Sequence, residues 1–169
     1  LGFGSYLFGF AVDKLSENVP NHYSEALHFY GWIEILIFIS GGLLSLLFSN
    51  FAEVYALSHS IIPESPPLQN LLKVVLSFAL MLIPTTFMGA TLPLISKYCV
   101  TNDERMGKQV SLLYALNTLG AAFGCMITGF FLMGTFGVLQ TVLMAAIGNL
   151  IIGISALSIY KEEIGGTVK

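Results

Sequence analysis

Residues 74–96 of the chain read VVLSFALMLIPTTFMGATLPLIS and contain no charged side chain. A helix needs roughly 20 mainly apolar residues to cross about 30 Å of hydrocarbon, and this stretch meets that length. Three further stretches of similar length hold a single charged residue between them, Glu34; they are Phe29–Phe51, Val110–Leu132 and Val138–Tyr160. The sequence therefore predicts an all-α, polytopic transmembrane helix bundle with four full spans.

Composition agrees with this class and excludes others. The chain is 55% hydrophobic and 10% charged, with a mean hydropathy of +0.80, and its charges fall almost entirely between the apolar stretches. A β-barrel would instead show segments of about ten residues that alternate in polarity. A net charge of -3 without a run of Lys or Arg gives no basic surface for nucleic acid. The lipid bilayer is the predicted partner.

The first apolar run, Leu1–Val12, is about half the length of a span and has no basic region in front of it, as a signal peptide would. We interpret it as the last half of a first span that is truncated, with an N-terminal helix missing. The predicted division is a transmembrane domain over 1–160 and a cytoplasmic tail over 161–169, where a linker to a missing domain begins.

The connecting segments predict the orientation. Segments 13–28, 97–109 and 161–169 together hold six Lys and Arg residues, whereas 52–73 and 133–137 hold only Lys73. Because basic residues gather on the cytoplasmic side, the first group should face the cytoplasm, with the C-terminus inside the cell and the protein in the inner membrane. The proline-containing segment 52–73 should face outward.

The connecting segments also carry local signals. We expect a short surface segment at Ala52–Ile62, a helix stop at Asn102–Asp103 and a tight turn at Met133–Gly137. His59 and Glu64 lack a third ligand at suitable spacing, so no metal site and no cofactor are predicted.

Glu34 is the single ionisable residue within a predicted span, about five residues from its cytoplasmic end. Two interpretations stay open. The carboxylate could face the bundle interior and bind a cation, with a polyamine as a candidate ligand. It could instead reach the headgroup layer or pair with Asn, Thr or Lys on a neighbouring helix.

Other intramembrane polar residues are better suited to hydrogen bonds between helices; they are Asn117, Thr85, Thr86 and Asn149. Pro84 and Pro93 each remove one helical hydrogen bond, leaving a carbonyl for Thr or water, and mark kinks. Gly120 and Gly124 form a G-x-x-x-G motif that favours close helix packing, chiefly within the chain, and Gly89 is assigned the same role.

Three motifs stand in a fixed order. They are GFAVDK at Gly9–Lys14, PTTFMGATLPL at Pro84–Leu94, and YALNTLGAAFG at Tyr114–Gly124. In order and spacing they resemble the membrane region of the fused major-facilitator/spermidine-synthase proteins. Gly9, Asp13 and Lys14 are similar to half of the loop signature of major-facilitator transporters.

The resemblance implies a cytoplasmic aminopropyltransferase domain after the membrane helices, which joins decarboxylated S-adenosylmethionine to putrescine. The family's glycine-rich nucleotide loop is not found in this sequence, so no catalytic residue is assigned and the chain alone is expected to have no enzymatic activity. The leading hypothesis is a membrane anchor that handles polyamines. The alternatives are a segment of a secondary transporter for a small solute and a structural module that assembles through Gly120 and Gly124.

Overall fold

The computed structural model describes residues 1–16, 22–50, 66–99 and 106–167; for 11–16, 22–23, 66 and 164–167 it describes the backbone alone. Each element in these ranges is helical, which confirms the all-α part of the predicted fold class. The elements are α1 (Gly2–Ser16), α2 (His22–Ser49), α4 (Pro66–Cys99), α5 (Met106–Ile127), the π-helical turn η2 (Thr128–Leu132) and α6 (Met133–Thr167).

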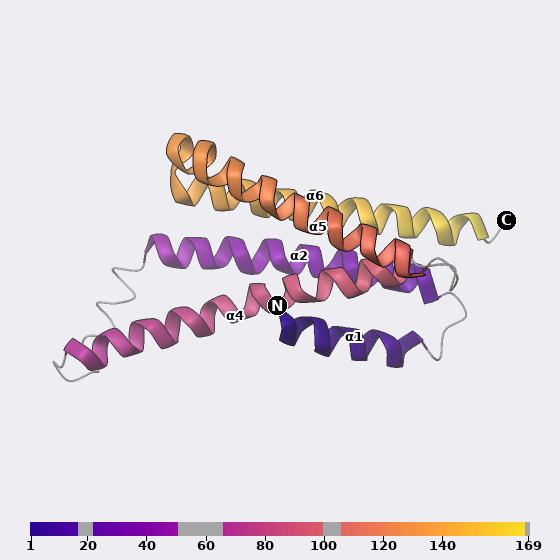
Figure 1. Cartoon of the computed structure of the whole chain (residues 1–169), viewed down its shortest axis with the longest axis horizontal. Coiled ribbons are helices and arrows are strands. Elements are labelled where there is room, and N and C mark those ends of the chain that lie inside the picture. The colour runs from indigo at the N-terminus through magenta and orange to yellow at the C-terminus, as the bar shows by residue number, and fades with distance from the viewer. Residues whose placement is uncertain (17–21, 51–65, 100–105, 168–169) are drawn as a thin grey trace.

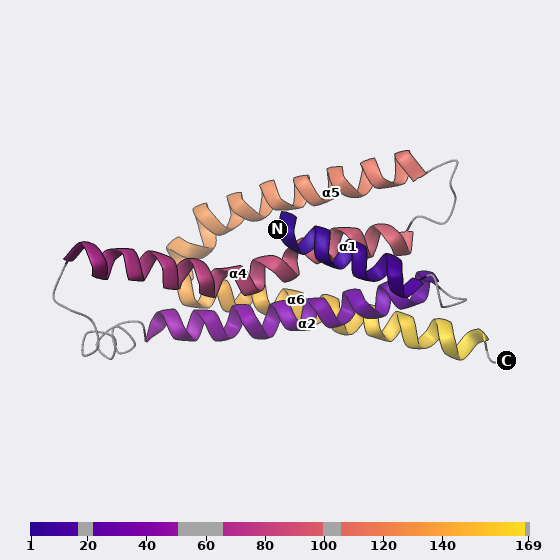
Figure 2. The same cartoon turned by 90° about the horizontal axis from the view of Figure 1, so that it is seen from below.

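The long helices run side by side with alternating direction (Figures 1 and 2). One end of the molecule, which we call the basic end, holds the last residues of α1, α4 and α6 and the first residues of α2 and α5. The opposite end holds the end of α2, the start of α4 and the connection from α5 to α6. This arrangement places the described residues of the segments predicted to share a side at the same end.

The helices pack unequally. α2 packs against α6 and α4, and α1 packs against α4. Among the described residues, α5 contacts only α4 and η2 and has no buried residue. The buried apolar residues in the described ranges are few, and half of them are alanines; they are Ala26, Leu27, Ile33, Ile37, Ala90, Leu94, Ala146 and Ala156. Ile33, Ile37, Ala90 and Leu94 form one cluster covered by Phe8 of α1. The packed core therefore lies where α1 covers α2 and α4.

Three helical stretches of the described chain are long and apolar enough to span a membrane: Ser24–Ser49, Pro67–Cys99 and Met106–Glu163. The last consists of two helical arms that are separated at Gly137, whose φ of 78° and ψ of 173° are not helical. Figures 1 and 2 show the chain reversing there, so that α6 returns toward the basic end. The predicted turn at Met133–Gly137 is confirmed at Gly137, whereas the count of four spans stays a prediction.

Helix ends differ from the predicted bounds. α1 continues past Val12 to Ser16, and α6 continues through the predicted tail as far as Thr167. Helical hydrogen bonding is satisfied within the segment, so a helix does not stop where its apolar residues stop. The predicted surface segment at 52–62, the pair His59 and Glu64, and the helix stop at 102–103 lie outside the described residues.

Candidate functional site

Gly89, which was singled out in the sequence together with Pro93, lies against α1. Pro93 has no N–H, so the carbonyl of Gly89, four residues earlier, lacks its ordinary helical donor. The hydroxyl of Ser5 donates a hydrogen bond to that carbonyl oxygen at 2.7 Å. The absence of a side chain at Gly89 permits this approach, because a Cβ there would collide with the carbonyl oxygen of Leu1. The freed carbonyl thus accepts a hydrogen bond from a neighbouring helix.

A second close crossing joins α2 and α6 through Gly31 and Gly153. A Cβ added at Gly153 would lie 2.9 Å from the carbonyl oxygen of Gly31 and 3.2 Å from Cβ of Glu34. A Cβ at Gly31 would lie 2.8 Å from Cγ of Leu157. Such small residues let helix backbones approach closely in lipid, where packing rather than hydrophobic burial drives association. Neither glycine was recognised in the sequence, because they are far apart in the chain and form no G-x-x-x-G motif.

Glu34 lies in this α2–α6 contact and is 6% exposed. Its carboxylate accepts a hydrogen bond from the hydroxyl of Tyr30, one turn earlier on α2. In the described part of the chain, no hydrogen bond joins this carboxylate to Asn, Thr or Lys of another helix. Its low exposure places Glu34 inside the bundle, and the binding of a cation there stays a prediction.

Pro84, Thr85 and Thr86 lie together on α4 but use their polar groups locally. The hydroxyl of Thr85 donates to the carbonyl of Met81 at 2.7 Å, and that of Thr86 to the carbonyl of Leu82 at 2.6 Å. The carbonyl that Pro84 deprives of its donor is that of Leu80, four residues earlier, so neither threonine replaces the lost bond. Bonds of this kind bend a helix.

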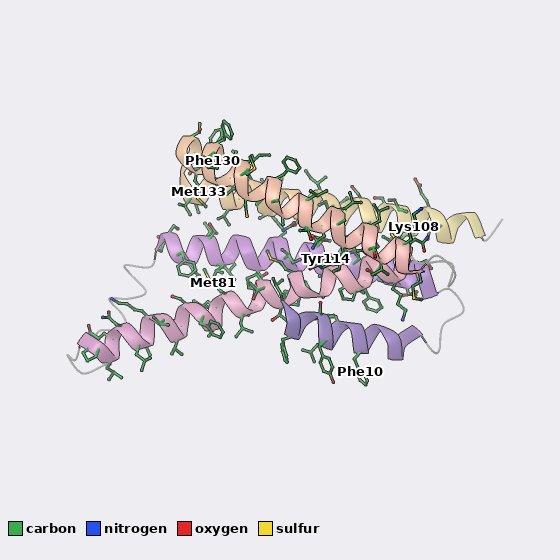
Figure 3. All side chains as sticks on the ribbon, viewed as in Figure 1. Phe10, Met81, Lys108, Tyr114, Phe130 and Met133 are labelled. Atoms are coloured by element: carbon green, nitrogen blue, oxygen red, sulfur yellow. The ribbon has the colours of Figure 1, made fainter. Side chains whose placement is uncertain are left out.

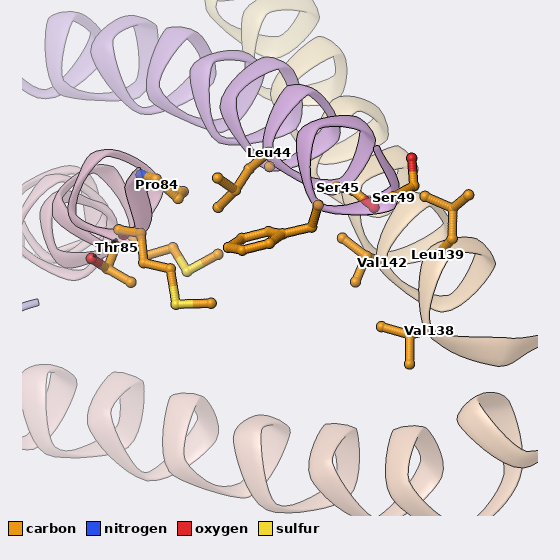
Figure 4. A pocket seen from close by; sticks show the side chains of 12 residues that line it. Leu44, Ser45, Ser49, Pro84, Thr85, Val138, Leu139 and Val142 are labelled. Atoms are coloured by element: carbon orange, nitrogen blue, oxygen red, sulfur yellow. Dashed lines mark hydrogen bonds between the residues drawn. The ribbon is translucent and has the colours of Figure 1, made fainter. Parts of the chain in front are cut away.

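An apolar cavity of about 610 Å³ opens beside Pro84 between α2, α4 and α6. Figure 4 shows Leu44 and Pro84 facing each other across it, with Val142 on the side of α6. The lining residues are Gly41, Leu44, Ser45, Phe48, Ser49, Met81, Pro84, Thr85, Met88, Val138, Leu139 and Val142. The cavity lies away from the cluster under α1, so the two halves of the bundle differ, one packed and one open.

The predicted polar and small residues of α5 lie apart from this cavity. Asn117 is exposed, and a Cβ at Gly120 or Gly124 would meet nothing within 4 Å. Packing of this motif within the chain is therefore not seen among the described residues. Asn149 on α6 is half-buried, and no hydrogen bond joins it to Glu34 in the described part of the chain.

The loop signature is described only in part. Gly9 lies within α1, and a Cβ there would meet nothing within 4 Å. Asp13 and Lys14 belong to the last turn of α1, where the backbone alone is described. The structure thus shows helix where the resemblance places the start of a loop.

At the basic end lies a group of aromatic and acidic side chains that was not predicted from the sequence. Tyr98 of α4 donates a hydrogen bond to Glu163 of α6 at 2.9 Å, and Tyr160 of α6 donates to Glu25 of α2 at 3.2 Å. The ring of His28 stacks on Tyr160, with centroids 4.6 Å apart. Trp and Tyr concentrate at membrane interfaces, so the aromatic residues near three helix ends could have indicated this group.

Trp32 belongs to the same group, because its indole Nε1 donates to Nε2 of His28 at 3.1 Å. These contacts tie the ends of α2, α4 and α6 together. Within the described ranges, no three His, Cys, Asp or Glu residues are grouped so that they could hold a metal ion.

No protein-family model, curated protein or solved structure matches the chain. The resemblance to fused major-facilitator/spermidine-synthase proteins therefore stays a prediction.

Proposed function

We propose that this chain is a multi-pass helical membrane domain that anchors a cytoplasmic enzyme. The observation that carries the membrane part is the apolar outer surface. Phe10 and Phe130 point away from the bundle (Figure 3) and are 67% and 79% exposed. Phe78 of α4 and Phe123 of α5 are 69% and 61% exposed. Soluble monomers rarely expose continuous apolar surface beyond a few hundred Å², whereas in a bilayer such side chains contact acyl chains.

The reversal at Gly137 supports two crossings within the third apolar stretch. That stretch is 58 residues long, almost three times the roughly 20 residues that one crossing needs. Its two arms, Met106–Leu132 and Val138–Glu163, each extend about 39 Å at 1.5 Å per residue. Together with α2 and α4 they make four full crossings.

Charge supports an orientation for these crossings. Lys97, Lys108 and Lys161 lie at the basic end, whereas Lys73 lies in the first part of α4, toward the opposite end. The basic end therefore faces the cytoplasm. Trp32 and Tyr160 lie near that end as well, which suits the interfacial level that such rings prefer.

In this orientation the end of α6 emerges into the cytoplasm, where an aminopropyltransferase joined to it would find its substrates. The anchoring role rests on this geometry together with the three sequence motifs. Polyamine handling has weaker support, because the carboxylate of Glu34 is enclosed and already bonded to Tyr30. A second candidate, a segment of a secondary transporter, is favoured by the cavity beside the proline-interrupted part of α4.

Membrane extraction tests the anchoring proposal. A soluble reporter domain joined after Lys169 should remain in the membrane pellet after alkaline carbonate washing, and protease should degrade it only when added from the cytoplasmic side. The reporter expressed alone is the control and should be soluble. Release of the fusion by carbonate would contradict the membrane assignment, and degradation by protease added to intact cells would contradict the orientation.

A further inference from the structure

The apolar cavity does not end within the bundle. A second, shallower and more open cavity, of about 640 Å³, adjoins it toward the end opposite the basic end and shares two lining residues with it, Phe48 and Met81. Its other lining residues are Lys73, Val74, Ser77 and Phe78, all on α4. The two cavities thus follow α4 from Lys73 past Pro84 as one groove, which we call the α4 groove.

The depth of the α4 groove matches one leaflet of a bilayer. Lys73 and Pro84 are eleven positions apart on one helix, which corresponds to about 16 Å along its axis. Half of a hydrocarbon core of about 30 Å is about 15 Å. If Lys73 lies at the level of the headgroups, the groove beside Pro84 lies near the bilayer centre.

The chemistry of the α4 groove changes along this depth. Near Pro84 its lining is carbon and sulfur from side chains such as Leu44, Met88 and Val142. The hydroxyls of Thr85 and Ser49 there donate to backbone carbonyls of their own helices. At the other limit of the groove Lys73 supplies a cationic amine. An apolar trough that ends at a cation is complementary to an amphiphile with an anionic head.

We propose that the α4 groove binds an anionic phospholipid of the outer leaflet, with its phosphate at Lys73 and one acyl chain lying between α2, α4 and α6 as far as Pro84. The volume of the cavity beside Pro84 falls within the range that small-molecule sites occupy, about 300–1,000 Å³. α5 contributes no lining residue, so the open side of the groove is not closed by this helix. The proposal rests on the membrane assignment made above.

Two adjacent glycines provide a matched pair of variants that test whether an acyl chain occupies the groove. A Cβ at Gly41 or at Gly42 would meet nothing within 4 Å, but only Gly41 lines the cavity. Gly41→Phe should therefore fill the space that the chain would occupy, and Gly42→Phe should leave it open. For the headgroup, Lys73→Gln removes the cation, and Lys108→Gln removes an exposed one at the basic end.

The measurement is native mass spectrometry of the full chain released from nanodiscs that contain equal parts of phosphatidylglycerol and phosphatidylcholine. The wild-type chain should retain phosphatidylglycerol about fivefold over phosphatidylcholine, the factor that one interfacial Lys provides. Lys73→Gln should abolish this preference, and Lys108→Gln should keep it. Gly41→Phe should lose both lipids, while Gly42→Phe retains them, with helix content checked by circular dichroism.

Several outcomes would overturn the proposal while leaving the membrane assignment intact. Equal retention of the two lipids by the wild-type chain would exclude headgroup recognition. Unchanged retention in Gly41→Phe would place the lipid elsewhere. If Gly41→Phe instead converted a dimer into a monomer, a helix of a second copy would be the occupant of the α4 groove. A chain that failed to enter nanodiscs and stayed monodisperse without detergent would contradict the membrane assignment itself.

Discussion

Pro93 and Ser5 show how a single missing N–H is compensated in this bundle. The proline lies in α4 and the serine in α1, yet the serine hydroxyl reaches the one carbonyl that the proline leaves without its helical donor, that of Gly89. An unpaired carbonyl in hydrocarbon is costly, so the bond links the conformation of α4 to the docking of α1.

A double-mutant cycle tests this link. Ser5→Ala should lower the free energy of unfolding by about 1 kcal/mol, a usual size for hydrogen bonds between membrane helices. In a Pro93→Ala background the restored N–H can donate to Gly89, so Ser5→Ala should cost much less there. Stability in mixed micelles, followed by circular dichroism, gives the four values.

Ser155→Ala is the matched control for this cycle, because Ser155 is exposed and its hydroxyl donates to the carbonyl of Ile151 on its own helix. It should cost little in either background. Equal costs of Ser5→Ala with and without Pro93 would show that the two residues are independent.

Glu34 illustrates what can be read from the sequence at this scale. An acid in an apolar run is visible at once, and Tyr30 stands at the i, i−4 spacing that brings two side chains together on a helix. The close approach of Gly153 is not visible, since it depends on where α6 crosses α2. The sequence thus identifies a buried acid. Its neighbours on other helices depend on tertiary packing and cannot be predicted from the sequence.

At the scale of elements, the backbone of Gly137 decides how many times the third apolar stretch can cross. Its φ of 78° and ψ of 173° belong to a region that essentially only glycine adopts. Gly137→Ala should therefore destabilise the chain by about 1–3 kcal/mol. Gly134→Ala is the comparison, because a Cβ there meets nothing within 4 Å.

Unfolding of both variants in detergent micelles measures the difference. A loss of stability confined to Gly137→Ala supports a fixed reversal at this residue. Equal stability of the two variants would mean that the turn is not held in the described conformation.

The elements themselves were largely predictable, because the length of an apolar run and the positions of Gly and Pro are local properties. The runs at 74–96, 110–132 and 138–160 lie within helices, and the run at 29–51 lies in α2 as far as the last residue of that helix, Ser49. The separation of α5 from α2 and α6 was not predictable. In lipid, the side of a helix that meets a neighbour is as apolar as the side that meets acyl chains, so no stripe of polarity marks the contact.

At the scale of the whole molecule, the bundle is packed in one half and open in the other. Small residues and α1 close the half that contains Ile33 and Leu94. The cavity opens where α4 continues beyond α1, toward the end opposite the basic end. Its lining comes from three helices far apart in the sequence. A cavity of this kind depends on how the helices cross, so it cannot be predicted from a pattern of residues in the sequence.

Cysteine accessibility in intact cells tests the central claim, a bundle embedded in the membrane with its basic end in the cytoplasm. With Cys99 and Cys125 replaced by Ser, single cysteines are introduced as Lys108→Cys, Gly134→Cys and Lys161→Cys, all at exposed positions. A membrane-impermeant thiol reagent should label position 134 from outside, and positions 108 and 161 only after the membrane is permeabilised. Labelling of 108 or 161 from outside, or protection of 134 together with them, would contradict the account.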